Sequence, residues 1–520
     1  MREKVLVLDF GSQTCQLIAR RVRELGVYCE IVPHDISAGE VSQAAPDFGE
    51  LSRVAAIILS GGPASVRTDE APSMDAAVLK MDIPILGICY GMQLLGQLLG
   101  GVVEKHTGGE YGPATLQVDR SDELFAGLDN HLDVWMSHGD LVRELPPGFD
   151  TLAHTDDCHV AAMGNAGKKV YGVQFHPEVV HTTKGKEILH NFLFRIAGCS
   201  GGWTMAGFIS KEVARIKQQV GDGRVICGLS GGVDSSVTAA LLNRAIGERM
   251  HAVFVDNGLL RAGEADQIEQ FFGKDFPLNM QLVDARREFI DALASVTDPE
   301  QKRKIIGKVF IDVFARTARD IGKIDFLAQG TLYPDVIESI SARGGPSATI
   351  KTHHNVGGLP DELGFELIEP LRELFKDEVR RLGTELGLPA HLVNRQPFPG
   401  PGLAVRIIGE VTEERLEILR SADTIVQQEM EGWEGYDRIW QSFAVLLPVK
   451  SVGVMGDERT YANVVAMRVV TSLDAMTADW ARLPHELLGR LSARIINEVH
   501  GVNRVVYDIS SKPPSTIEWE

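Results

Sequence analysis

Residues 83–99 read IPILGICYGMQLLGQLL, and this stretch decides the fold of the first part of the chain. An apolar run ends at a glycine and a cysteine, and a segment with helical periodicity follows at once. The same order of apolar run, glycine turn and helical pattern occurs after Val5–Leu8 and after Ala55–Leu59. Its repetition predicts a parallel α/β sheet within residues 1–200.

The same order begins again at residues 224–236, which read RVICGLSGGVDSS. Arg224–Leu229 predicts a strand, a helix is expected from Val233, and His251–Asp256 predicts the next strand. The sequence therefore predicts a second parallel-sheet α/β domain after the first.

Two segments mark the boundaries between domains. Residues 197–202 are small and rich in glycine, which is typical of a linker. Residues 396–402 read QPFPGPG and cannot lie inside a helix or a central strand, because proline lacks the amide hydrogen and glycine costs too much backbone entropy. The predicted domains are therefore residues 1–205, 206–395 and 396–520.

The third predicted domain is a small α+β domain. Apolar runs predict its strands at residues 443–449, 464–470 and 505–509, and periodic segments predict its helices at residues 413–431 and 485–500. No internal repeat is evident, so the two α/β domains are interpreted as fused and not as duplicated.

The composition bounds the class of protein. With 520 residues, 44% of them hydrophobic and 24% charged, the chain is long enough for several buried cores and is not typical of disorder. No apolar run approaches the roughly 18 residues of a membrane span, and no signal-peptide pattern is evident, so we expect a cytoplasmic protein without a membrane partner. A net charge of −19 repels polyanions, which argues against nucleic acid as a partner.

The cysteines indicate a nucleophile and no metal or disulfide framework. All six are scattered over the first half of the chain without a CxxC pair. Gly87, Cys89 and Gly91 form the pattern G-x-C-x-G between a predicted strand and helix, the thiol version of a nucleophile elbow. A cysteine at a strand end can also be a plain core residue, but the flanking glycines and the helix favour the nucleophile.

A free thiol is only slightly ionised at neutral pH, so a nucleophilic Cys89 needs a base. Residues 173–178, VQFHPE, can supply it in His176, with Glu178 in place to orient the imidazole. These residues resemble the class I glutamine amidotransferases, and the resemblance covers roughly residues 4–200. It implies that Cys89 attacks the side-chain amide of glutamine, that His176 acts as general base and then acid, and that Glu178 orients His176.

The same resemblance implies which groups surround the substrate. The SGGP segment at residues 60–63 is similar to the oxyanion-hole loop of the family, where backbone amides stabilise the tetrahedral intermediate. Gln93, on the predicted helix after Cys89, is expected to hold glutamine together with a loop at residues 137–140, SHGD. An ordinary glycine turn is the alternative for this loop. The implied oxyanion and glutamine-binding positions are Gly61, Tyr90, Gln93, Ser137 and His138.

Residues 230–236, SGGVDSS, lie between a predicted strand and a predicted helix. Backbone amides and hydroxyls there can enclose an anion at the positive end of the helix dipole. The G-K-[ST] of a Walker loop is absent, so the usual γ-phosphoryl transfer is not expected. Residues 228–232 also satisfy the serine hydrolase pattern G-x-S-x-G, and a turn without a ligand is a further alternative. The form S-G-G-x-D-S resembles the signature of the N-type ATP pyrophosphatases.

Three further segments are similar to the GMP synthetase branch of that family, at residues 254–258, 329–335 and 350–358. This resemblance implies that ATP adenylates the xanthine C2 oxygen of XMP with loss of pyrophosphate, and that ammonia then displaces AMP. It also implies a lid lysine at Lys351, whose point charge suits a phosphate. The adjacent pair His353–His354 could be a metal pair, but adjacent side chains diverge, so we interpret it as part of a loop.

The implied ATP site is built on the glycine-serine loop. Its positions are Ser230, Gly231, Gly232, Val233, Asp234, Ser235, Ser236, Val255 and Lys351. The triphosphate charge requires Mg²⁺ as a cofactor, and the carboxylates of Asp234 or Asp335 are expected to help hold it.

The end of the chain, residues 510–520, matches the end of the GMP synthetases. The resemblance implies that Arg261, Gln441, Lys512 and Glu518 bind XMP, and that the third domain forms a homodimer. The sequence thus predicts a ligase that forms a C–N bond with glutamine as amido donor. An NAD synthetase or a nucleic-acid thiolation enzyme would keep both sites and change the acceptor, and a nucleotide-sensing scaffold is the alternative outside enzymes.

Overall fold

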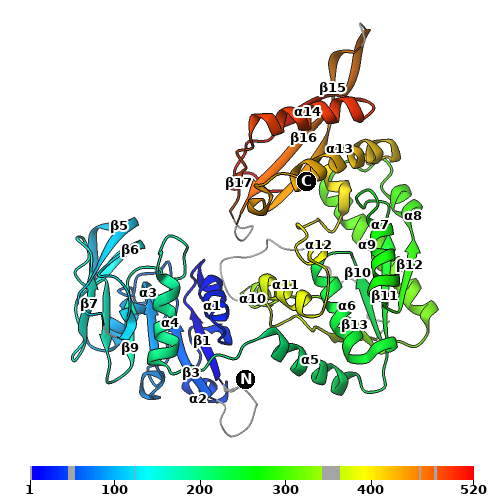
Figure 1. Cartoon of the computed structure of the whole chain (residues 1–520). Helices are drawn as coiled ribbons and strands as arrows, with labels where there is room; N and C mark the ends of the chain where they lie inside the picture. Colours follow the sequence, from blue (N-terminus) through cyan, green and yellow to red (C-terminus); the bar gives the residue numbers. More distant parts are fainter. Residues whose placement is uncertain (1–2, 45–52, 122, 342–363, 456–457, 473–476) are drawn as a thin grey trace. The chain divides into compact units, whose positions relative to one another are not determined.

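The structure is a computed structural model that describes residues 3–44, 53–121, 123–341, 364–455, 458–472 and 477–520 (Figure 1). The chain divides into two compact units, Met1–Phe208 and Ile209–Glu520. The predicted boundary at residue 205 lies close to this division, and the predicted boundary at residue 395 lies inside the second unit.

A nine-stranded sheet forms the centre of the first unit, with the order β2-β1-β3-β4-β9-β8-β7-β5-β6. Its first five strands are parallel: β2 (Cys29–Pro33), β1 (Glu3–Asp9), β3 (Arg53–Leu59), β4 (Ile85–Ile88) and β9 (Val170–Val173). The others pair in antiparallel fashion: β8 (Ala162–Asn165), β7 (Asp150–His154), β5 (Val102–Val118) and β6 (His131–Glu144). The predicted α/β class is confirmed, but this sheet is mixed, because short connections favour antiparallel neighbours.

The helices of the first unit are α1 (Cys15–Glu24), α2 (Ala38–Gln43), η1 (Val78–Lys80), α3 (Tyr90–Leu98), η2 (Glu123–Phe125), α4 (Gly185–His190) and η3 (Asn191–Ile196). The core joins strand residues such as Leu6 and Ile57 to Leu95 of α3. Helix α3 is buried over most of its length because it packs against β4 and β9 at the middle of the sheet. The nucleophile elbow therefore lies at the carboxyl end of a central strand.

A five-stranded parallel sheet begins the second unit, as predicted. Its order is β12 (Met280–Asp284), β11 (Met250–Asp256), β10 (Val225–Leu229), β13 (Phe326–Ala328) and β14 (Glu366–Ile368). The chain runs outward from β10 on one side to β11 and on the other side to β13. Ligands of open parallel sheets bind where the strand order reverses in this way, at the carboxyl ends of the strands. The SGGVDSS loop follows β10 at that point.

The helices around this sheet are α5 (Met205–Val220), α6 (Val233–Ile246), η4 (Gly247–Arg249), α7 (Glu264–Gln270), η5 (Phe271–Asp275), α8 (Arg286–Ala292), α9 (Pro299–Ile321), α10 (Tyr333–Ser341), α11 (Lys376–Glu385) and α12 (Ala390–Val393). Helix α9 begins sharply because Asp298 caps it, accepting a hydrogen bond from the Gln301 amide, and Pro299 occupies its first turn.

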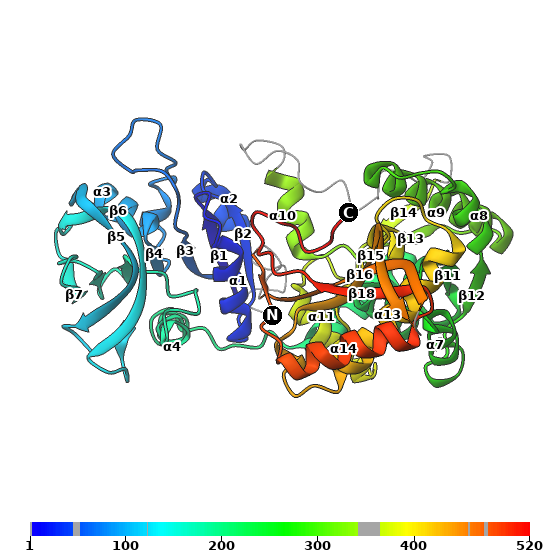
Figure 2. The ribbon, with the colours of Figure 1, turned by 90° about the horizontal axis from the view of Figure 1, so that it is seen from above.

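A second, small sheet completes this unit. It contains β15 (Gln441–Met455), β16 (Glu458–Thr471), β17 (Asp479–Trp480) and β18 (Val502–Tyr507), and β18 pairs with β16. Its helices are η7 (Gly402–Arg406), α13 (Glu413–Glu431), η8 (Tyr436–Arg438) and α14 (His485–Glu498). Helices α13 and α14 contact each other and the sheet (Figure 2).

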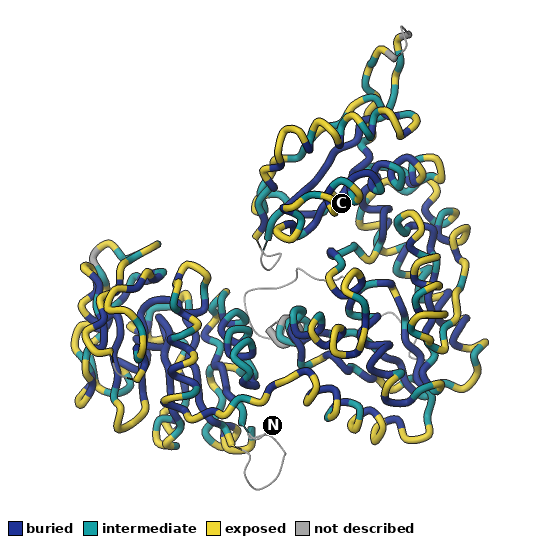
Figure 3. Tube along the Cα trace, viewed as in Figure 1, coloured by how far each residue is buried: buried dark blue, intermediate teal, exposed yellow. Residues whose placement is uncertain are grey.

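One hydrophobic core runs through both parts of the second unit. It extends from Val253 of the parallel sheet through Leu403 to Leu491 of α14. The buried segments of both sheets are visible along the chain trace (Figure 3). The proline-rich segment at residues 396–402 therefore separates the parallel sheet from the small sheet along the chain, but the hydrophobic core continues across it. None of the helices in the described ranges combines the length and the apolar character of a membrane span.

Candidate active sites

The elbow at Cys89 is a strained turn between β4 and α3. Cys89 has a φ of 51° and a ψ of −106°, a conformation that side chains rarely adopt. The flanking glycines leave no room for a side chain: a Cβ at Gly87 would lie 2.5 Å from the Gly91 carbonyl carbon, and a Cβ at Gly91 would lie 2.6 Å from Leu59 Cβ. Close packing of the turn thus projects the cysteine out of the sheet, as in a nucleophile elbow.

Hydrogen bonds hold the backbone of this turn. The Cys89 amide donates to the Val173 carbonyl at 2.8 Å, and the Gly91 amide donates to the Ser60 carbonyl at 3.1 Å. Gly61 lies against the reactive side chains, because a Cβ there would be 3.1 Å from His176 Cε1 and 3.8 Å from Cys89 Cβ. The SGGP loop therefore lies beside the thiol, where an oxyanion hole is required.

His176 and Glu178 lie beside the cysteine. His176 Nδ1 is 2.8 Å from Glu178 Oε1, which also accepts a hydrogen bond from Thr14 Oγ1 at 2.7 Å. Arg21 Nε donates to the Glu178 carbonyl at 3.0 Å. The other carboxylate oxygen, Oε2, is buried without a hydrogen-bond partner in the described part of the chain. The structure thus brings the three predicted catalytic residues together.

The environment of His176 favours the imidazolium. Burial lowers the pKa of this side chain, but hydrogen bonds to Cys89 and Glu178 and the negative charge of both raise it to about 10. A protonated His176 beside Cys89 is the arrangement that stabilises a thiolate at neutral pH. The electrostatics of the site therefore suit a nucleophilic cysteine.

The segment 137–140 differs from the prediction: it lies within strand β6 and is not a loop. Ser137 pairs with Tyr111, His138 with Glu110 and Asp140 with Lys105 of β5, and the register shifts at the glycine between the last two pairs. Cys89 Sγ donates to the Ser137 carbonyl at 3.5 Å. Strand β6 therefore brings Ser137 to the thiol through its backbone.

The imidazole of His138 contacts groups of strands β5 and β6. Its Nε2 lies 3.1 Å from Glu110 Oε2, and its Nδ1 lies 3.0 Å from the Asp140 carbonyl. Gln93 Nε2 donates to the same carbonyl at 2.8 Å. Four of the predicted positions thus surround Cys89, while the imidazole of His138 supports the strand.

Sequence reasoning missed two residues of this site. Gln174 is fully buried, and its Nε2 lies 3.7 Å from Cys89 Sγ. It stands two residues before His176 in the VQFHPE segment, and this spacing is the signal that could have identified it. Thr14 binds Glu178 from 164 positions away in the sequence, and no local pattern indicates that contact.

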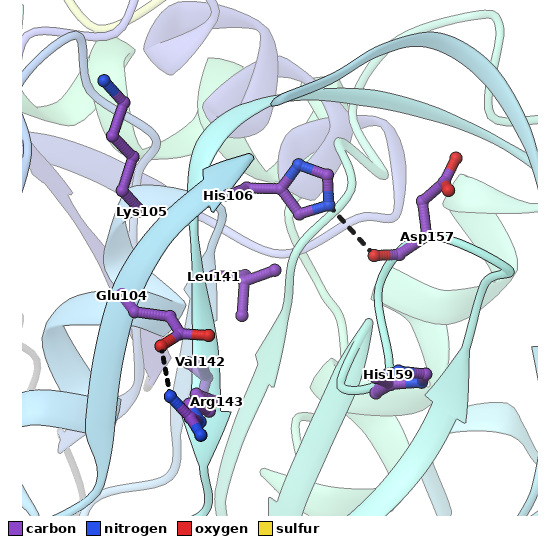
Figure 4. Close-up of a pocket in the computed structure, with 8 residues that line it drawn as sticks. All are labelled: Glu104, Lys105, His106, Leu141, Val142, Arg143, Asp157 and His159. Atoms are coloured by element: carbon purple, nitrogen blue, oxygen red, sulfur yellow. Dashed lines mark hydrogen bonds and ion pairs between the residues drawn. The ribbon is translucent and has the colours of Figure 1, made fainter. Parts of the chain in front are cut away.

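A separate cavity in the first unit has a volume of about 450 Å³ (Figure 4). It is lined by Glu104, Lys105, His106, Leu141, Val142, Arg143, Asp157 and His159. Two contacts cross its lining: Arg143 donates to Glu104 at 2.8 Å, and His106 Nε2 is 3.1 Å from the Asp157 carbonyl. None of the predicted site residues lines it, so we assign it no role in the chemistry.

In the second unit, the SGGVDSS loop forms an open turn at the start of α6. Gly231 has a φ of 75°, which glycine adopts without strain, and Gly232 caps the helix. Ser230 and Ser235 hydrogen-bond through their hydroxyls at 3.0 Å, and Ser235 Oγ accepts from the Ser230 amide at 3.1 Å. Among the described residues no group bonds to the buried hydroxyl of Ser236. The turn presents amides and hydroxyls in the way that a phosphate cradle requires.

Asp234 stands in the first turn of α6 and pairs with Lys376. Lys376 Nζ lies 2.6 and 2.5 Å from the two carboxylate oxygens. Lys376 is the first residue of α11 and was not singled out from the sequence, since nothing near it forms a known motif. The predicted lid lysine, Lys351, and the pair His353–His354 lie outside the described residues.

The remaining positions of the predicted ATP site lie near the same sheet edge. Val255 is buried in β11, next to the strand that bears the loop. Asp335 Oδ2 accepts a hydrogen bond from the Leu332 amide at 3.0 Å and thereby caps α10. The carboxylate of Asp234 suits Mg²⁺, which prefers oxygen ligands, whereas one oxygen of Asp335 already serves its helix.

Glu518, near the end of the chain, binds two of the groups around the predicted XMP site. Arg406 donates to both carboxylate oxygens, from Nε at 3.1 Å and from a terminal nitrogen at 2.9 Å. Gln441 Nε2 donates to Glu518 Oε1 at 2.8 Å. The buried Arg406 was not predicted, and its bidentate contact fixes the position of Glu518.

Arg261 belongs to the same cluster. Its guanidinium lies 5.0 Å from the Phe398 ring centre, and that of Arg406 lies 5.2 Å from the same ring. Arg261 Nε is 2.9 Å from Asp423 Oδ2, although neither atom is aligned for a hydrogen bond. Burial lowers the pKa of Arg261. Two guanidinium groups gathered around an aromatic ring form a site suited to an anion.

Two buried cations bind the final segment of the chain, residues 510–520. Arg468 donates to the carbonyls of Ser510 at 2.6 Å and Thr516 at 3.1 Å. Lys302 Nζ lies 2.5 Å from Glu520 Oε2. Lys512 lies on this segment, where its backbone pairs with Ala478. The segment is ordered by these contacts although it contains no helix or strand.

Comparison with known proteins identifies three successive regions. The family Glutamine amidotransferase class-I matches residues 6–196, NAD synthase matches residues 205–299, and GMP synthase C terminal domain matches residues 428–519. Together with the site geometry, these matches define the class: a class I glutamine amidotransferase joined to an ATP pyrophosphatase.

Relatives over the whole chain narrow this class. A GMP synthase (glutamine-hydrolyzing) of Solidesulfovibrio magneticus is 60% identical and covers 100% of this chain and 99% of that protein. Another of Nitratidesulfovibrio vulgaris is 57% identical, with 99% of both chains covered. A solved structure from Thermoplasma acidophilum, described as part of a putative GMP synthase, is 33% identical and covers 38% of this chain and 94% of that chain; its TM-score of 0.33 is too low for a conclusion about the fold. The chain belongs to the family of glutamine-hydrolysing GMP synthases.

Proposed function

We propose that this chain converts XMP, ATP, L-glutamine and water to GMP, AMP, pyrophosphate and L-glutamate. The observation that carries the proposal is the presence, on one chain, of a buried Cys-His-Glu arrangement and an open phosphate-binding turn. Membership of the GMP synthase family supports XMP as the acceptor. The activity is that of a ligase that forms a C–N bond.

At the first site, His176 takes the proton of the Cys89 thiol, and the thiolate attacks the side-chain carbonyl carbon of glutamine. The amides of Gly61 and Tyr90 stabilise the oxyanion that forms. His176 then gives its proton to the leaving nitrogen, so that ammonia departs from a thioester. Water, activated by His176, releases glutamate. Glu178 holds the imidazole through its 2.8 Å hydrogen bond.

Glutamine is held next to the thiol by Gln93 and by the backbone of Ser137. The support is the position of Gln93 on α3, one turn after Cys89, and the contact of Cys89 with the Ser137 carbonyl. His138 contributes by positioning β6 through its contacts with Glu110 and Asp140.

At the second site, the xanthine C2 oxygen of XMP attacks the α-phosphorus of ATP. An O–P bond forms, the bond to the β-phosphate oxygen breaks, and pyrophosphate leaves. Ammonia then attacks C2, and the C–O bond breaks with departure of AMP. Residues 230–236 bind pyrophosphate oxygens through amides and hydroxyls, and Lys351 and Lys376 neutralise their charge. Val255 supplies an apolar contact for the nucleotide.

Mg²⁺ bound by Asp234 would offset the charge of the triphosphate, and Asp335 is a secondary candidate ligand. The buried Ser236 hydroxyl, which has no partner among the described residues, is consistent with a ligand at this turn. Lys376 then has two alternative partners, the Asp234 carboxylate and the phosphates.

XMP is bound by Arg261, Gln441, Lys512 and Glu518. The contacts of Glu518 with Gln441, and the cations around Phe398, support a compact nucleotide site. A homodimer through the small sheet is supported by exposed apolar side chains on β15 and β16, among them Val454 and Tyr461. The cytoplasm is the proposed location, because Cys89 has to remain a reduced thiol.

The test compares Cys89→Ala with Asp234→Ala, each supplied with glutamine or with ammonium at alkaline pH. Conversion of XMP to GMP is measured in all four cases. Cys89→Ala should lose glutamine-driven synthesis and retain ammonium-driven synthesis, because it lacks only the source of ammonia. Asp234→Ala should lose both. A folded, ATP-binding Cys89→Ala variant that is inactive with ammonium would contradict the proposed division of labour.

A further inference from the structure

Gln174 is a buried amide in contact with the reactive sulfur. It follows β9 directly, its side chain is fully buried, and its Nε2 lies 3.7 Å from Cys89 Sγ. The roles assigned above to Cys89, His176 and Glu178 make no use of it. A buried polar side chain needs partners, and one of the partners here is the nucleophile itself.

The orientation of this amide is fixed by a chain of hydrogen bonds. The Asp140 carbonyl can only accept, so the group of Gln93 that lies 2.8 Å from it must be the NH₂ group. The same NH₂ group is 3.3 Å from the side chain of Gln174, which must therefore present its carbonyl oxygen to Gln93. The NH₂ group of Gln174 is then directed at the sulfur. A reversed Gln174 would place two donors against each other.

The sulfur can use these surroundings in both protonation states. As a thiol, Cys89 donates to the Ser137 carbonyl at 3.5 Å. As a thiolate it can only accept, and Gln174 Nε2 and His176 are the donors that reach it. The carbonyl of Ser137 then repels the negative charge and turns the thiolate toward those donors.

We propose that Gln174 is a catalytic residue of the glutaminase, whose side-chain N–H donates to the Cys89 thiolate and aims it at glutamine. The proposal rests on the proposed function of this site. Gln174 exchanges no proton: the thiol proton passes to His176, and the amide supplies only a fixed donor. Its Oε1 also holds Gln93, so that one amide couples the nucleophile to a residue that holds the substrate.

The test uses two variants of the full chain and measures the pH dependence of Cys89 alkylation by iodoacetamide, corrected with Cys89→Ala. Gln174→Glu keeps the shape and replaces the donor by a carboxylate, so the alkylation midpoint should rise by about one to two pH units. Gln174→Met removes the donor without adding charge and should raise it less. The rate constant kcat for glutamine hydrolysis should fall about a hundredfold in the first variant and about tenfold in the second, with a smaller change in KM.

Gln97→Glu is the matched control, because it adds the same charge at an exposed position of α3. It should leave the midpoint and kcat unchanged, and ammonium-driven synthesis should be normal in all three variants. An unshifted midpoint in Gln174→Glu, or a rise in KM with unchanged kcat, would overturn the proposal. Hydrolysis of glutamine by Cys89→Ala would instead refute the proposed function of the site.

A measurement on the unaltered sequence covers the case in which the variants do not fold. In the ¹⁵N spectrum of protein labelled at glutamine side chains, the Gln174 amide resonance should move as Cys89 ionises. The corresponding resonance should not titrate in this way in Cys89→Ala. A resonance that is insensitive to Cys89 would overturn the assignment.

Discussion

The turns at Cys89 and at Ser230 both join a parallel strand to a helix, but they use the backbone in opposite ways. At the first turn the positive φ falls on the reactive residue, and two glycines without room for a Cβ hold it there. At the second turn the positive φ falls on Gly231, which adopts it without strain. The first turn uses strain to project one side chain, whereas the second uses glycine to present several backbone amides.

The surroundings of the two turns also differ, in burial and in hydrogen bonding. Cys89, His176 and Glu178 are buried and hydrogen-bonded to one another or to nearby groups, so the glutaminase is largely preorganised. Ser230 is exposed, and Asp234 is paired with a lysine that also suits a phosphate. A covalent nucleophile requires one fixed geometry, whereas an anion cradle has to admit and release its ligand.

Adding a methyl group to one glycine of each turn is the strongest way to break this comparison. Gly91→Ala would place Cβ 2.6 Å from Leu59 Cβ, which forces the elbow to move. A shift of about 1 Å commonly costs a hundredfold, so glutamine hydrolysis should fall at least about a hundredfold. Gly231→Ala meets only side-chain ends, the nearest at 3.3 Å, and should reduce synthesis about tenfold or less through its φ strain. Steady-state rates with glutamine and with ammonium distinguish the two; equal losses would contradict the comparison.

Lys376→Ala tests whether catalysis at the SGGVDSS turn needs the positive charge of Lys376. Loss of one well-placed cation should lower synthesis about a hundredfold with either nitrogen source, because the defect lies in adenylation. AMP and pyrophosphate release is the measurement. Lys211→Ala, which removes a partly exposed partner of Glu373, is the control and should have little effect. Normal adenylation by Lys376→Ala would leave the lysine a purely structural partner of Asp234.

The charge pair of His176 and Glu178 should make the stability of the first unit depend on pH. Because the pKa of His176 is raised to about 10, the imidazolium contributes stability that is fully present below an unfolded pKa of about 6.5 and is lost as the pH rises toward 10. Glu178→Gln removes one source of the shift. Its melting temperature should fall below that of the parent at pH 6 and approach it at pH 10. A constant difference across this range would show that Glu178 acts without its charge.

Thr14→Val should give the smallest effect. The substitution removes one hydrogen bond to Glu178 Oε1 and keeps the side-chain volume. The loss of one such bond to a carboxylate, worth about 1.5 kcal/mol, corresponds to roughly a tenfold decrease at most in glutamine hydrolysis. Ammonium-driven synthesis should be unchanged. An equal loss with ammonium would place the defect outside the glutaminase.

Local sequence patterns predict many of the strands and helices. Most of the site residues that these patterns miss have partners far away in the sequence. The run before Cys89 and the helix after it are where the pattern places them, and helix α13 has the predicted bounds Glu413–Glu431. The family resemblance predicts a loop for the SHGD segment, but pairing with β5 makes this segment part of strand β6. Lys376 and Arg406 escaped notice because only tertiary contacts give them partners.

The contact between Thr14 and Glu178 also limits the order in which the glutaminase can form. Its two residues are 164 positions apart, and β9, which precedes Glu178, occupies a place between β4 and β8 in the middle of the sheet. The elbow cysteine is synthesised well before His176, the proposed base. A nascent chain that carries Cys89 but not yet β9 lacks both the central strand and the imidazole. Hydrolysis of glutamine therefore cannot begin on the ribosome before β9 has been synthesised and has paired with its neighbours in the sheet.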